Sequence, residues 1–195
     1  MKATKTLPEN YALAWEMDVE KDKRQMWLLQ VLGLPWALLV LFFLGWFTLR
    51  VRPEVIGADP GEVSMGIVLA LLPVMGISIM LHELVHGVFF WVFTREQPRF
   101  GFKLLYAYAT APGWHFSTSY YWLIGLAPLI LLTAIGLAMV PLVPQILVYL
   151  LLFAIFTNAS GAIGDLYIVI LLALEPAGTL VEDQGTGFRV FRRLN

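Results

Sequence analysis

Two histidines and a glutamate form the pattern His-Glu-x-x-His at residues 82–86. On a helix, residues four apart lie on one face, so His82 and His86 can present two imidazole nitrogens to a single metal ion. Glu83 lies beside them, where it can take the proton of an attacking water molecule. Two neutral ligands and an acid that is not itself a ligand are typical of zinc hydrolases. Because a pattern with three fixed letters also arises by chance, the surrounding sequence decides its meaning.

The surrounding sequence is that of a membrane protein. Of the 195 residues, 59% are hydrophobic and 14% are charged, and the mean hydropathy of +0.75 is high for a soluble globular domain. The net charge is -1 and no basic block occurs, so we expect no nucleic-acid partner. The chain contains no cysteine, so any metal site must use His, Asp, Glu or Asn side chains.

Four apolar segments reach the length of roughly 20 residues that a helix needs to cross a bilayer. They cover residues 26–49, 63–93, 120–140 and 145–174. We expect a single membrane domain over residues 26–174, between a polar segment of residues 1–25 and a polar tail of residues 175–195. A short surface helix is expected around Tyr11 to Lys23. The predicted fold class is therefore an all-α integral membrane protein with four transmembrane helices.

Residues 94–119 interrupt the apolar pattern between the second and third spans. Large apolar side chains recur there at the period of two that is typical of a strand, at Phe100, Phe102, Leu104, Tyr106 and Tyr108. We expect a short strand or hairpin that lies at the membrane surface or re-enters the membrane. If the hairpin lies inside the membrane, protein or water must cover its backbone. The same side chains also suit an aromatic belt at the membrane interface.

The distribution of positive charge predicts the orientation. Because four spans are predicted, the segments before the first span and after the last span lie on the same side of the membrane. Eleven of the 13 Lys and Arg residues fall in the first segment, the second connection or the tail, and two fall in the first connection. Lys and Arg accumulate on the cytoplasmic side of membrane proteins. We therefore expect a multi-pass protein of a prokaryotic cell membrane, with both termini in the cytoplasm.

A second acid lies inside the predicted spans. Asp165 and Glu83 are the only acids in the four segments, and His82 and His86 are the only histidines there. Ionisable groups inside a membrane are costly, and a functional site is their default explanation. Leu84, at the centre of the motif, and Asp165 each lie nine residues before the predicted cytoplasmic ends of their spans. That is about 14 Å at a rise of about 1.5 Å per residue, so the matched depth favours Asp165 as the third ligand.

Small residues surround this acid. Ser160, Gly161 and Gly164 allow a neighbouring helix to approach closely, as it must if a carboxylate is to reach a metal ion held by another span. Asn158 lies seven residues before Asp165 on the same helical face, so we expect it to orient a substrate carbonyl or a metal ligand. The alternative is a polar cluster that only holds the helices together.

Several segments together resemble a known family. They are His82-Glu83-Leu84-Val85-His86-Gly87, Phe100-Gly101-Phe102, Tyr106-Ala107-Tyr108-Ala109, Ala127-Pro128 and the stretch from Asn158 to Asp165. They are similar to the zincin peptidase family catalogued as domain of unknown function 3267, which is itself similar to the site-2 intramembrane metalloproteases. The resemblance implies His82, His86 and Asp165 as zinc ligands and Glu83 as the catalytic acid/base. Unlike the site-2 pattern, no proline follows Asn158, so we expect a less broken fourth helix.

The predicted function is zinc-dependent hydrolysis of peptide bonds in a membrane-protein or peptide substrate within the lipid bilayer. Three protein ligands leave a fourth position open for the reaction. A polar cavity that opens to the cytoplasm would admit water, and the strand near Phe100 to Tyr108 could offer an edge to an extended substrate. The second class of function is a membrane protein that binds a metal or a partner without hydrolysis. His115 is expected to be a polar loop residue, and it is the next candidate ligand after Asp165.

Overall fold

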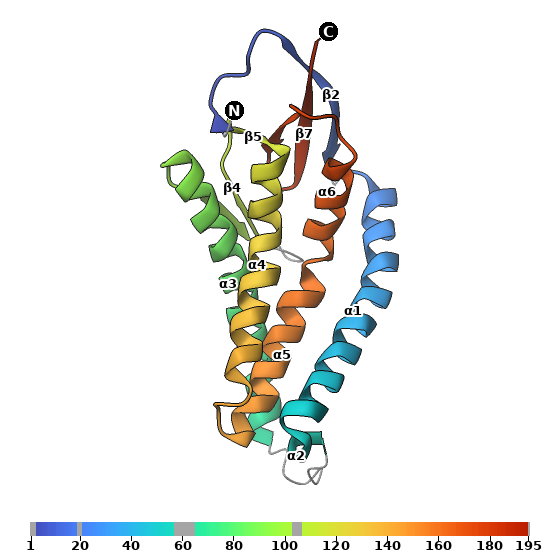
Figure 1. The fold of residues 1–195 in the computed structure, drawn as a ribbon, viewed down its shortest axis with the longest axis vertical. Coiled ribbons are helices and arrows are strands. Elements are labelled where there is room, and N and C mark those ends of the chain that lie inside the picture. The colour runs from blue at the N-terminus through green and yellow to red at the C-terminus, as the bar shows by residue number, and fades with distance from the viewer. Residues whose placement is uncertain (1–2, 19–20, 57–64, 103–106, 195) are drawn as a thin grey trace. The chain divides into compact units, whose positions relative to one another are not determined.

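Long helices and short strands make up the computed structural model of the chain, which describes residues 3–18, 21–56, 65–102 and 107–194. Figure 1 shows these elements in chain order. The helices are α1 (Lys23–Val51), α2 (Pro53–Ile56), α3 (Met65–Thr94), α4 (Thr118–Met139), α5 (Gln145–Gly161) and α6 (Ile163–Ala173). The strands are β1 (Ala3–Thr4), β2 (Tyr11–Asp18), β3 (Arg99–Phe102), β4 (Ala107–Thr110), β5 (His115–Ser117), β6 (Leu180–Asp183) and β7 (Gly187–Arg193).

Among the described residues, four helical stretches are long and apolar enough to cross a membrane. They are α1, α3, α4 and the stretch Gln145–Ala173 that contains α5 and α6. Each coincides with one of the four predicted spans, so the transmembrane part of the fold prediction is confirmed at the level of length and composition. Many apolar side chains on these helices remain exposed, among them Trp27, Phe42 and Leu69, as expected for surfaces that face lipid.

The all-α prediction was wrong, because the structure also contains a five-stranded antiparallel sheet. Its strand order is β1-β5-β6-β7-β2, so residues from near both ends of the chain lie side by side in it (Figure 1). Tyr11 is paired with Arg193 and Asp18 with Gly187. The expected surface helix around Tyr11 is thus a strand. Its backbone hydrogen bonds go to a partner that lies far away in the sequence, which a local pattern does not reveal.

The expected hairpin between the second and third spans is present. Strands β3 and β4 form a separate two-stranded antiparallel sheet in which Gly101 lies opposite Tyr108. Leu104 and Tyr106, which were predicted to belong to this strand pattern, lie outside the described residues. The position of the hairpin relative to the membrane stays a prediction.

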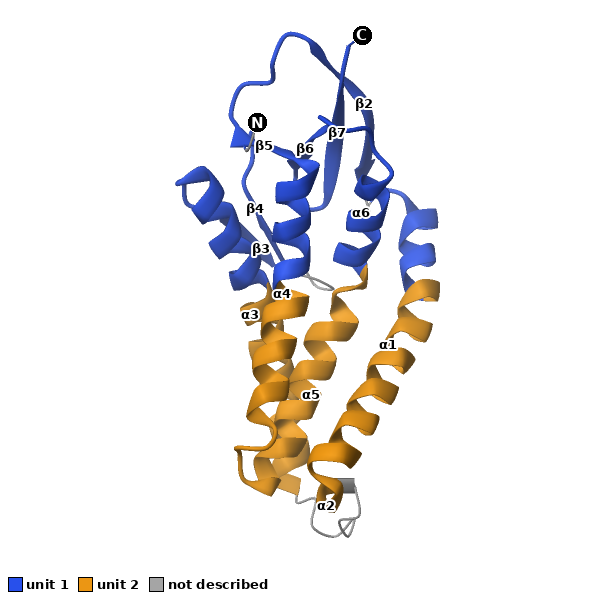
Figure 2. Cartoon of the chain, in the orientation of Figure 1, with its two compact units in different colours: residues 1–30, 83–127, 164–195 blue, residues 31–82, 128–163 orange. Residues whose placement is uncertain are grey.

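The chain divides into two compact units (Figure 2). Unit 1 consists of residues 1–30, 83–127 and 164–195, and unit 2 consists of residues 31–82 and 128–163. All seven strands belong to unit 1, whereas the described residues of unit 2 are mainly helical. Each of the helices α1, α3 and α4 contributes residues to both units.

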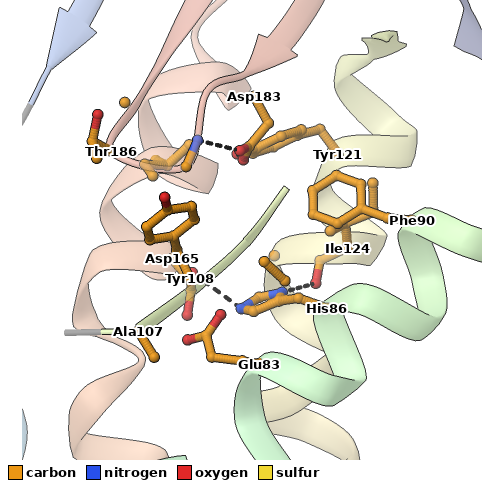
Figure 3. Close-up of a pocket in the computed structure, with 15 residues that line it drawn as sticks. Glu83, His86, Phe90, Ala107, Tyr108, Tyr121, Ile124, Asp165, Asp183 and Thr186 are labelled. Atoms are coloured by element: carbon orange, nitrogen blue, oxygen red, sulfur yellow. Dashed lines mark hydrogen bonds and ion pairs between the residues drawn. The ribbon is translucent and has the colours of Figure 1, made fainter. Parts of the chain in front are cut away.

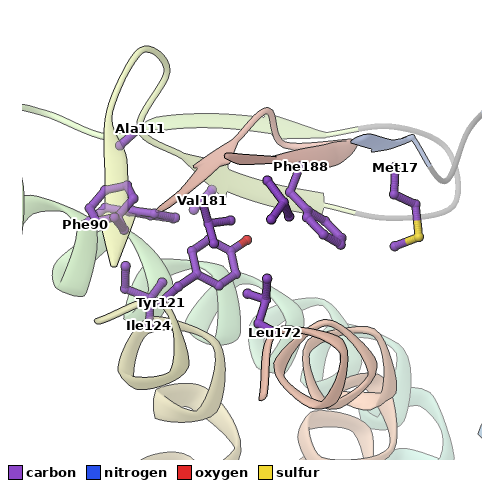
Figure 4. Packing of buried hydrophobic residues seen from close by; sticks show 11 residues of the cluster. Met17, Phe90, Ala111, Tyr121, Ile124, Leu172, Val181 and Phe188 are labelled. Atoms are coloured by element: carbon purple, nitrogen blue, oxygen red, sulfur yellow. The ribbon is translucent and has the colours of Figure 1, made fainter. Parts of the chain in front are cut away.

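The core of unit 1 forms where the sheet packs on helices. Phe116, Val181 and Val190 occupy one row across three neighbouring strands, because Phe116 pairs with Val181 and Val181 with Val190. All three are fully or almost fully buried. Side chains such as Val181 and Phe188 meet Tyr121, Ile124 and Leu172 from the helices (Figure 4). Burying a side chain of this size stabilises a fold by about 1.5–3 kcal/mol, so the sheet is an integral part of unit 1.

The core of unit 2 is formed by helices alone. Val40 and Leu44 of α1 pack with residues of α4 and α5, including Val148, Ile155 and Ala159. A hydrogen bond from the indole nitrogen of Trp36 to the carbonyl of Ala159, at 2.7 Å, adds a polar contact.

Candidate metal centre

Helix α3 places both histidines of the motif on one face. His86 is 7% exposed, and its Nδ1 lies 2.9 Å from the carbonyl oxygen of Ile124. Because a carbonyl oxygen only accepts hydrogen bonds, Nδ1 must carry the proton and donate it. The other ring nitrogen, Nε2, then keeps its lone pair, which is the form of histidine that binds a metal.

Asp165 approaches the Nε2 atom of His86. It lies in the first turn of α6, and its Oδ1 is 3.5 Å from Nε2 of His86 (Figure 3). With Nδ1 as the proton-bearing nitrogen, both atoms are electron-pair donors, and two donors at this distance repel each other unless a proton or a cation lies between them. The pair therefore fits a cation-binding site.

The fourth span is interrupted just before Asp165. Helix α5 ends at Gly161, the intervening Ala162 has φ -71° and ψ 6°, and α6 starts at Ile163. The interruption is limited to this one residue and involves no proline. Glycine is a poor helix former, and the hydroxyl of Ser160 donates to the carbonyl of Phe156, a contact that tends to bend helices. The expectation that this helix is less broken than in the site-2 pattern stays a prediction.

Asn158 orients His82. The amide nitrogen of Asn158 donates to the carbonyl of Pro128 and to Oγ1 of Thr133, both at 3.2 Å. Its Oδ1 is therefore left as an acceptor, and it lies 3.0 Å from Nδ1 of His82. By the same reasoning as for His86, His82 carries its proton on Nδ1, and Nε2 keeps its lone pair. Asn158 is 4% exposed, so of its two predicted roles the geometry favours orienting a ligand over touching a substrate.

The three predicted ligands come together. The candidate ligand atoms of His82, His86 and Asp165 all lie within 4.8 Å of one another. Tetrahedral zinc, at about 2.0–2.2 Å from each nitrogen or oxygen, needs such atoms roughly 3.4 Å apart, which is within reach of small side-chain rotations. Two imidazoles, each fixed by a hydrogen bond on its other nitrogen, and one carboxylate form a donor set that fits zinc.

Glu83 lines a pocket of about 150 Å³ within unit 1, together with His86 and Asp165. The remaining wall is formed by β4, by α4 and by the turn between β6 and β7 (Figure 3). Thr110 ties this wall together, because its hydroxyl donates to the carbonyl of Asp183 at 3.0 Å. The glutamate of the motif therefore lines the same pocket as two of the predicted ligands.

Tyr108 of β4 lines the same pocket, and two glycines make room for its ring. A Cβ atom added at Gly101 would lie 2.3 Å from the ring, and one at Gly185 would lie 2.5 Å from it. Both distances are far below van der Waals contact. Gly185 also has φ +81°, a conformation that favours glycine. Sequence reasoning identified Tyr108 only as a strand residue and gave no indication of its place in the pocket.

Two further pocket residues, Tyr121 and Asp183, were missed. The hydroxyl of Tyr121 donates to Oδ2 of Asp183 at 2.5 Å, and the backbone N–H of Gly185 donates to Oδ1 at 2.8 Å. Burial raises the pKa of the Asp183 carboxyl above its ordinary value. An acid in a polar tail carries no special signal, whereas an acid in an apolar span does.

His115 does not belong to this site. It lies in β5, is 8% exposed and meets the ring of Phe191 edge-on at 5.1 Å between centroids. The expectation of a polar loop residue was wrong. Within the described ranges, the group that could hold a metal ion consists of His82, His86 and Asp165 and does not include His115.

Two histidines one helical turn apart, an adjacent glutamate and a carboxylate from a later helix define a zincin-type site. The family model described as "Putative zincin peptidase", domain of unknown function 3267, matches residues 67–180, which is more than half of the chain. The chain therefore belongs to this family. The matched segment contains all three candidate ligands and Glu83, and it ends before Asp183. Neither a curated protein nor a solved structure matches the chain.

Proposed function

We propose that the protein is a zinc-dependent intramembrane metallopeptidase that hydrolyses peptide bonds of membrane-associated substrates. The observation that carries the proposal is the convergence of His82, His86 and Asp165 within 4.8 Å. Glu83 lines the same pocket as His86 and Asp165. Membership of a zincin peptidase family and four helices of membrane-spanning length support the proposal.

The chain supplies the groups that the reaction needs. Zinc, when bound, provides a Lewis acid for carbonyl and water activation. Glu83 accepts the proton of the attacking water and returns it to the amine that leaves. His82 and His86 are held in the correct tautomer by Asn158 and by the Ile124 carbonyl, and Asp165 offsets positive charge in a low-dielectric interior.

An extended substrate has a place to bind beside this centre. Ala107, Tyr108 and Ala109 of β4 line the pocket that contains Glu83. A substrate that is held in the extended conformation along β4 would present its backbone carbonyls to the pocket. An extended backbone is also accessible to attack, whereas the carbonyls of a helix are occupied by their own hydrogen bonds.

We also propose that both termini are cytoplasmic, because eleven of the 13 Lys and Arg residues lie on the side of the termini in the four-span topology. The chain lacks cysteine, so single introduced cysteines report on topology without background. Leu142→Cys, in the exposed turn after α4, should react with an impermeant thiol reagent outside intact cells. Arg193→Cys, in β7, should react only after permeabilisation, and the opposite pattern would reverse the orientation.

The function is tested by separating metal binding from hydrolysis. The purified protein in detergent should contain about one zinc per chain, and Glu83→Gln should keep that zinc. Removal of a general acid/base costs about a hundredfold to ten-thousandfold in rate, so peptide hydrolysis by Glu83→Gln should fall by that amount. Glu96→Gln, which removes an exposed carboxyl that pairs with Lys5, is the matched control and should retain activity. A wild-type protein that binds zinc but hydrolyses nothing would instead support metal or partner binding without catalysis.

A further inference from the structure

The pocket beside the candidate metal centre contains a third carboxyl group. Glu83 and Asp165 lie near His86 at one end, and Asp183 lies with Tyr121 at the other end (Figure 3). Asp183 is the last residue of β6, and the turn that follows contributes Gly185, Thr186 and Gly187 to the pocket wall. The reaction proposed above uses the first end of this pocket and leaves the second end without a role.

Asp183 forms no ion pair with a lysine or arginine among the described residues. Its two oxygens accept hydrogen bonds from the Tyr121 hydroxyl and the Gly185 backbone, which are neutral donors. Arg189, on the next strand, instead forms ion pairs with Glu16 at 3.1 Å and with Glu182 at 3.8 Å. Buried carboxylates are normally paired with a cation, because desolvation of an isolated charge is costly.

The pocket as a whole is acidic. Its described lining includes three carboxyl groups and one imidazole but no lysine or arginine. A bound divalent cation would offset the carboxyl groups at the metal end, which leaves Asp183 as the uncompensated charge. The volume of about 150 Å³ is far larger than the roughly 10–15 Å³ that one water molecule requires. That space suits one extended side chain, and the Tyr108 ring limits its width.

We propose that this pocket is a subsite for a lysine or arginine side chain next to the scissile bond, and that Asp183 is the residue that selects it. The inference rests on the proposed function, since the scissile bond must lie at the metal end of the pocket. Each carboxylate oxygen has a second lone pair, so a cationic side chain can add a charge-assisted hydrogen bond to those from Tyr121 and Gly185. These two groups position the carboxyl, and the substrate supplies its counter-charge.

Peptide binding tests the subsite without requiring turnover. Zinc-loaded Glu83→Gln protein in detergent is titrated with fluorescent peptides that differ only in carrying Lys, Gln or Glu at each position flanking the central bond. At one position, the lysine peptide should bind about tenfold or more tightly than the glutamine peptide, as expected for a hydrogen bond to a charged group, and the glutamate peptide should bind most weakly. Adding Asp183→Asn should reduce the preference for lysine to near one.

Glu182→Gln is the matched control, because it removes a neighbouring carboxyl that pairs with Arg189 and does not line the pocket. The preference for lysine should survive this change. Equal binding of the lysine and glutamine peptides, or a preference that persists in Asp183→Asn, would overturn the subsite. Zinc content and thermal unfolding verify that each variant is folded.

A second variant covers the case in which Asp183→Asn does not fold. Thr186→Lys introduces an ammonium group on the turn that lines the pocket, where it can pair with Asp183 and displace the substrate's cation. It should abolish the preference for lysine, and a retained preference would overturn the proposal. Cleavage by the wild-type protein separates the two proposals. If the lysine peptide binds selectively but no peptide is cleaved, the peptidase function fails and the cation subsite remains.

Discussion

The two units of the chain differ in how they use polar side chains. Around the pocket of unit 1, three acids and a histidine lie close together, supported by strands, turns and helix ends. The cavities of unit 2 are lined almost entirely by apolar side chains, as in the cavity of about 310 Å³ between Trp36, Phe43 and Leu129. Among the described residues, the buried polar side chains of unit 2 are those of Thr48, Ser78 and Asn158, and all three are neutral. Ser78, for example, donates to the carbonyl of Ala154 at 2.9 Å.

The two units therefore differ in the charge of their interior polar groups. Charged groups need many hydrogen-bond donors and partners to offset desolvation, and the irregular backbone of unit 1 supplies them, as Gly185 does for Asp183. Regular helices have already used their backbone donors. Unit 2 contains neutral hydrogen bonds, among them the bond between Asn158 and His82.

The largest effect on zinc affinity is expected for a charged residue of unit 1. Asp165→Asn should weaken zinc binding at least a hundredfold, because even changes to residues that only support a ligand cost tenfold to a hundredfold. Chelation should lower the thermal stability of the wild-type protein and leave that of Asp165→Asn nearly unchanged. Competition with a chromogenic chelator measures the affinity. Asp183→Asn, in the same pocket, is the control and should keep its zinc; full zinc in Asp165→Asn would place the third ligand elsewhere.

A smaller effect on zinc affinity is expected for the neutral hydrogen bond of unit 2. Asn158→Ala removes the acceptor of the His82 N–H, so zinc affinity should fall by about tenfold to a hundredfold. Asn158→Asp keeps an acceptor oxygen at that position and should lose less. The same chelator competition compares the two variants. If Asn158→Ala loses as much zinc affinity as Asp165→Asn, the expectation that a charged ligand matters more than a neutral orienting residue is incorrect.

The sheet of unit 1 and the helices of unit 2 should also differ in their tolerance of a methyl group. A Cβ at Gly187 would lie 2.0 Å from the backbone oxygen of Met17, whereas a Cβ at Gly76 would meet nothing within 4 Å. Gly187→Ala should therefore destabilise the fold by about 1–3 kcal/mol, the usual effect of overpacking. Gly76→Ala should be neutral or stabilising by up to about 1 kcal/mol. Unfolding midpoints in one detergent compare the two, and equal midpoints would argue against the close β2–β7 contact.

The smallest effect concerns acid stability. The Arg192 guanidinium, which donates twice to the Glu175 carboxylate, holds the pKa of that group below its ordinary value of 4.5. The folded state then binds this proton less readily than the unfolded state. The stabilisation is present above pH 4.5 and is lost as the pH falls through the lowered pKa. Glu175→Gln should flatten this part of the pH–stability curve, and an unchanged slope would show that other carboxyls account for it.

The helices could be predicted because their signal is local. A run of about 20 apolar residues is sufficient to define a membrane span, and all four runs are helices in the structure. Strand β2 could not be predicted in the same way. Its partner is β7, so Trp15 lies opposite Val190, and the two segments are separated by most of the chain. Pairing over such a distance leaves no short-range pattern beyond an alternation that also occurs by chance.

The candidate site was predictable to the extent that its residues contrast with their surroundings. His86 and Asp165 are conspicuous inside apolar spans, and the structure places them 3.5 Å apart. Asp183 lies among other polar residues, so only the folded pocket distinguishes it from Glu182. The one-residue interruption at Ala162 directly follows Ser160 and Gly161 and involves no proline, so a search for proline does not reveal it.

The pairing of β2 with β7 has a consequence for biosynthesis. Residues 11–18 leave the ribosome early but must wait for residues 187–193 before they can form their ladder. The turn that carries Asp183 and Gly187 emerges at the same late stage, after α3, α4 and the Asp165 helix can already have entered the bilayer. A nascent chain therefore contains its candidate ligands His82, His86 and Asp165 before the wall of the pocket exists. Synthesis of the last two strands sets the moment at which the pocket closes.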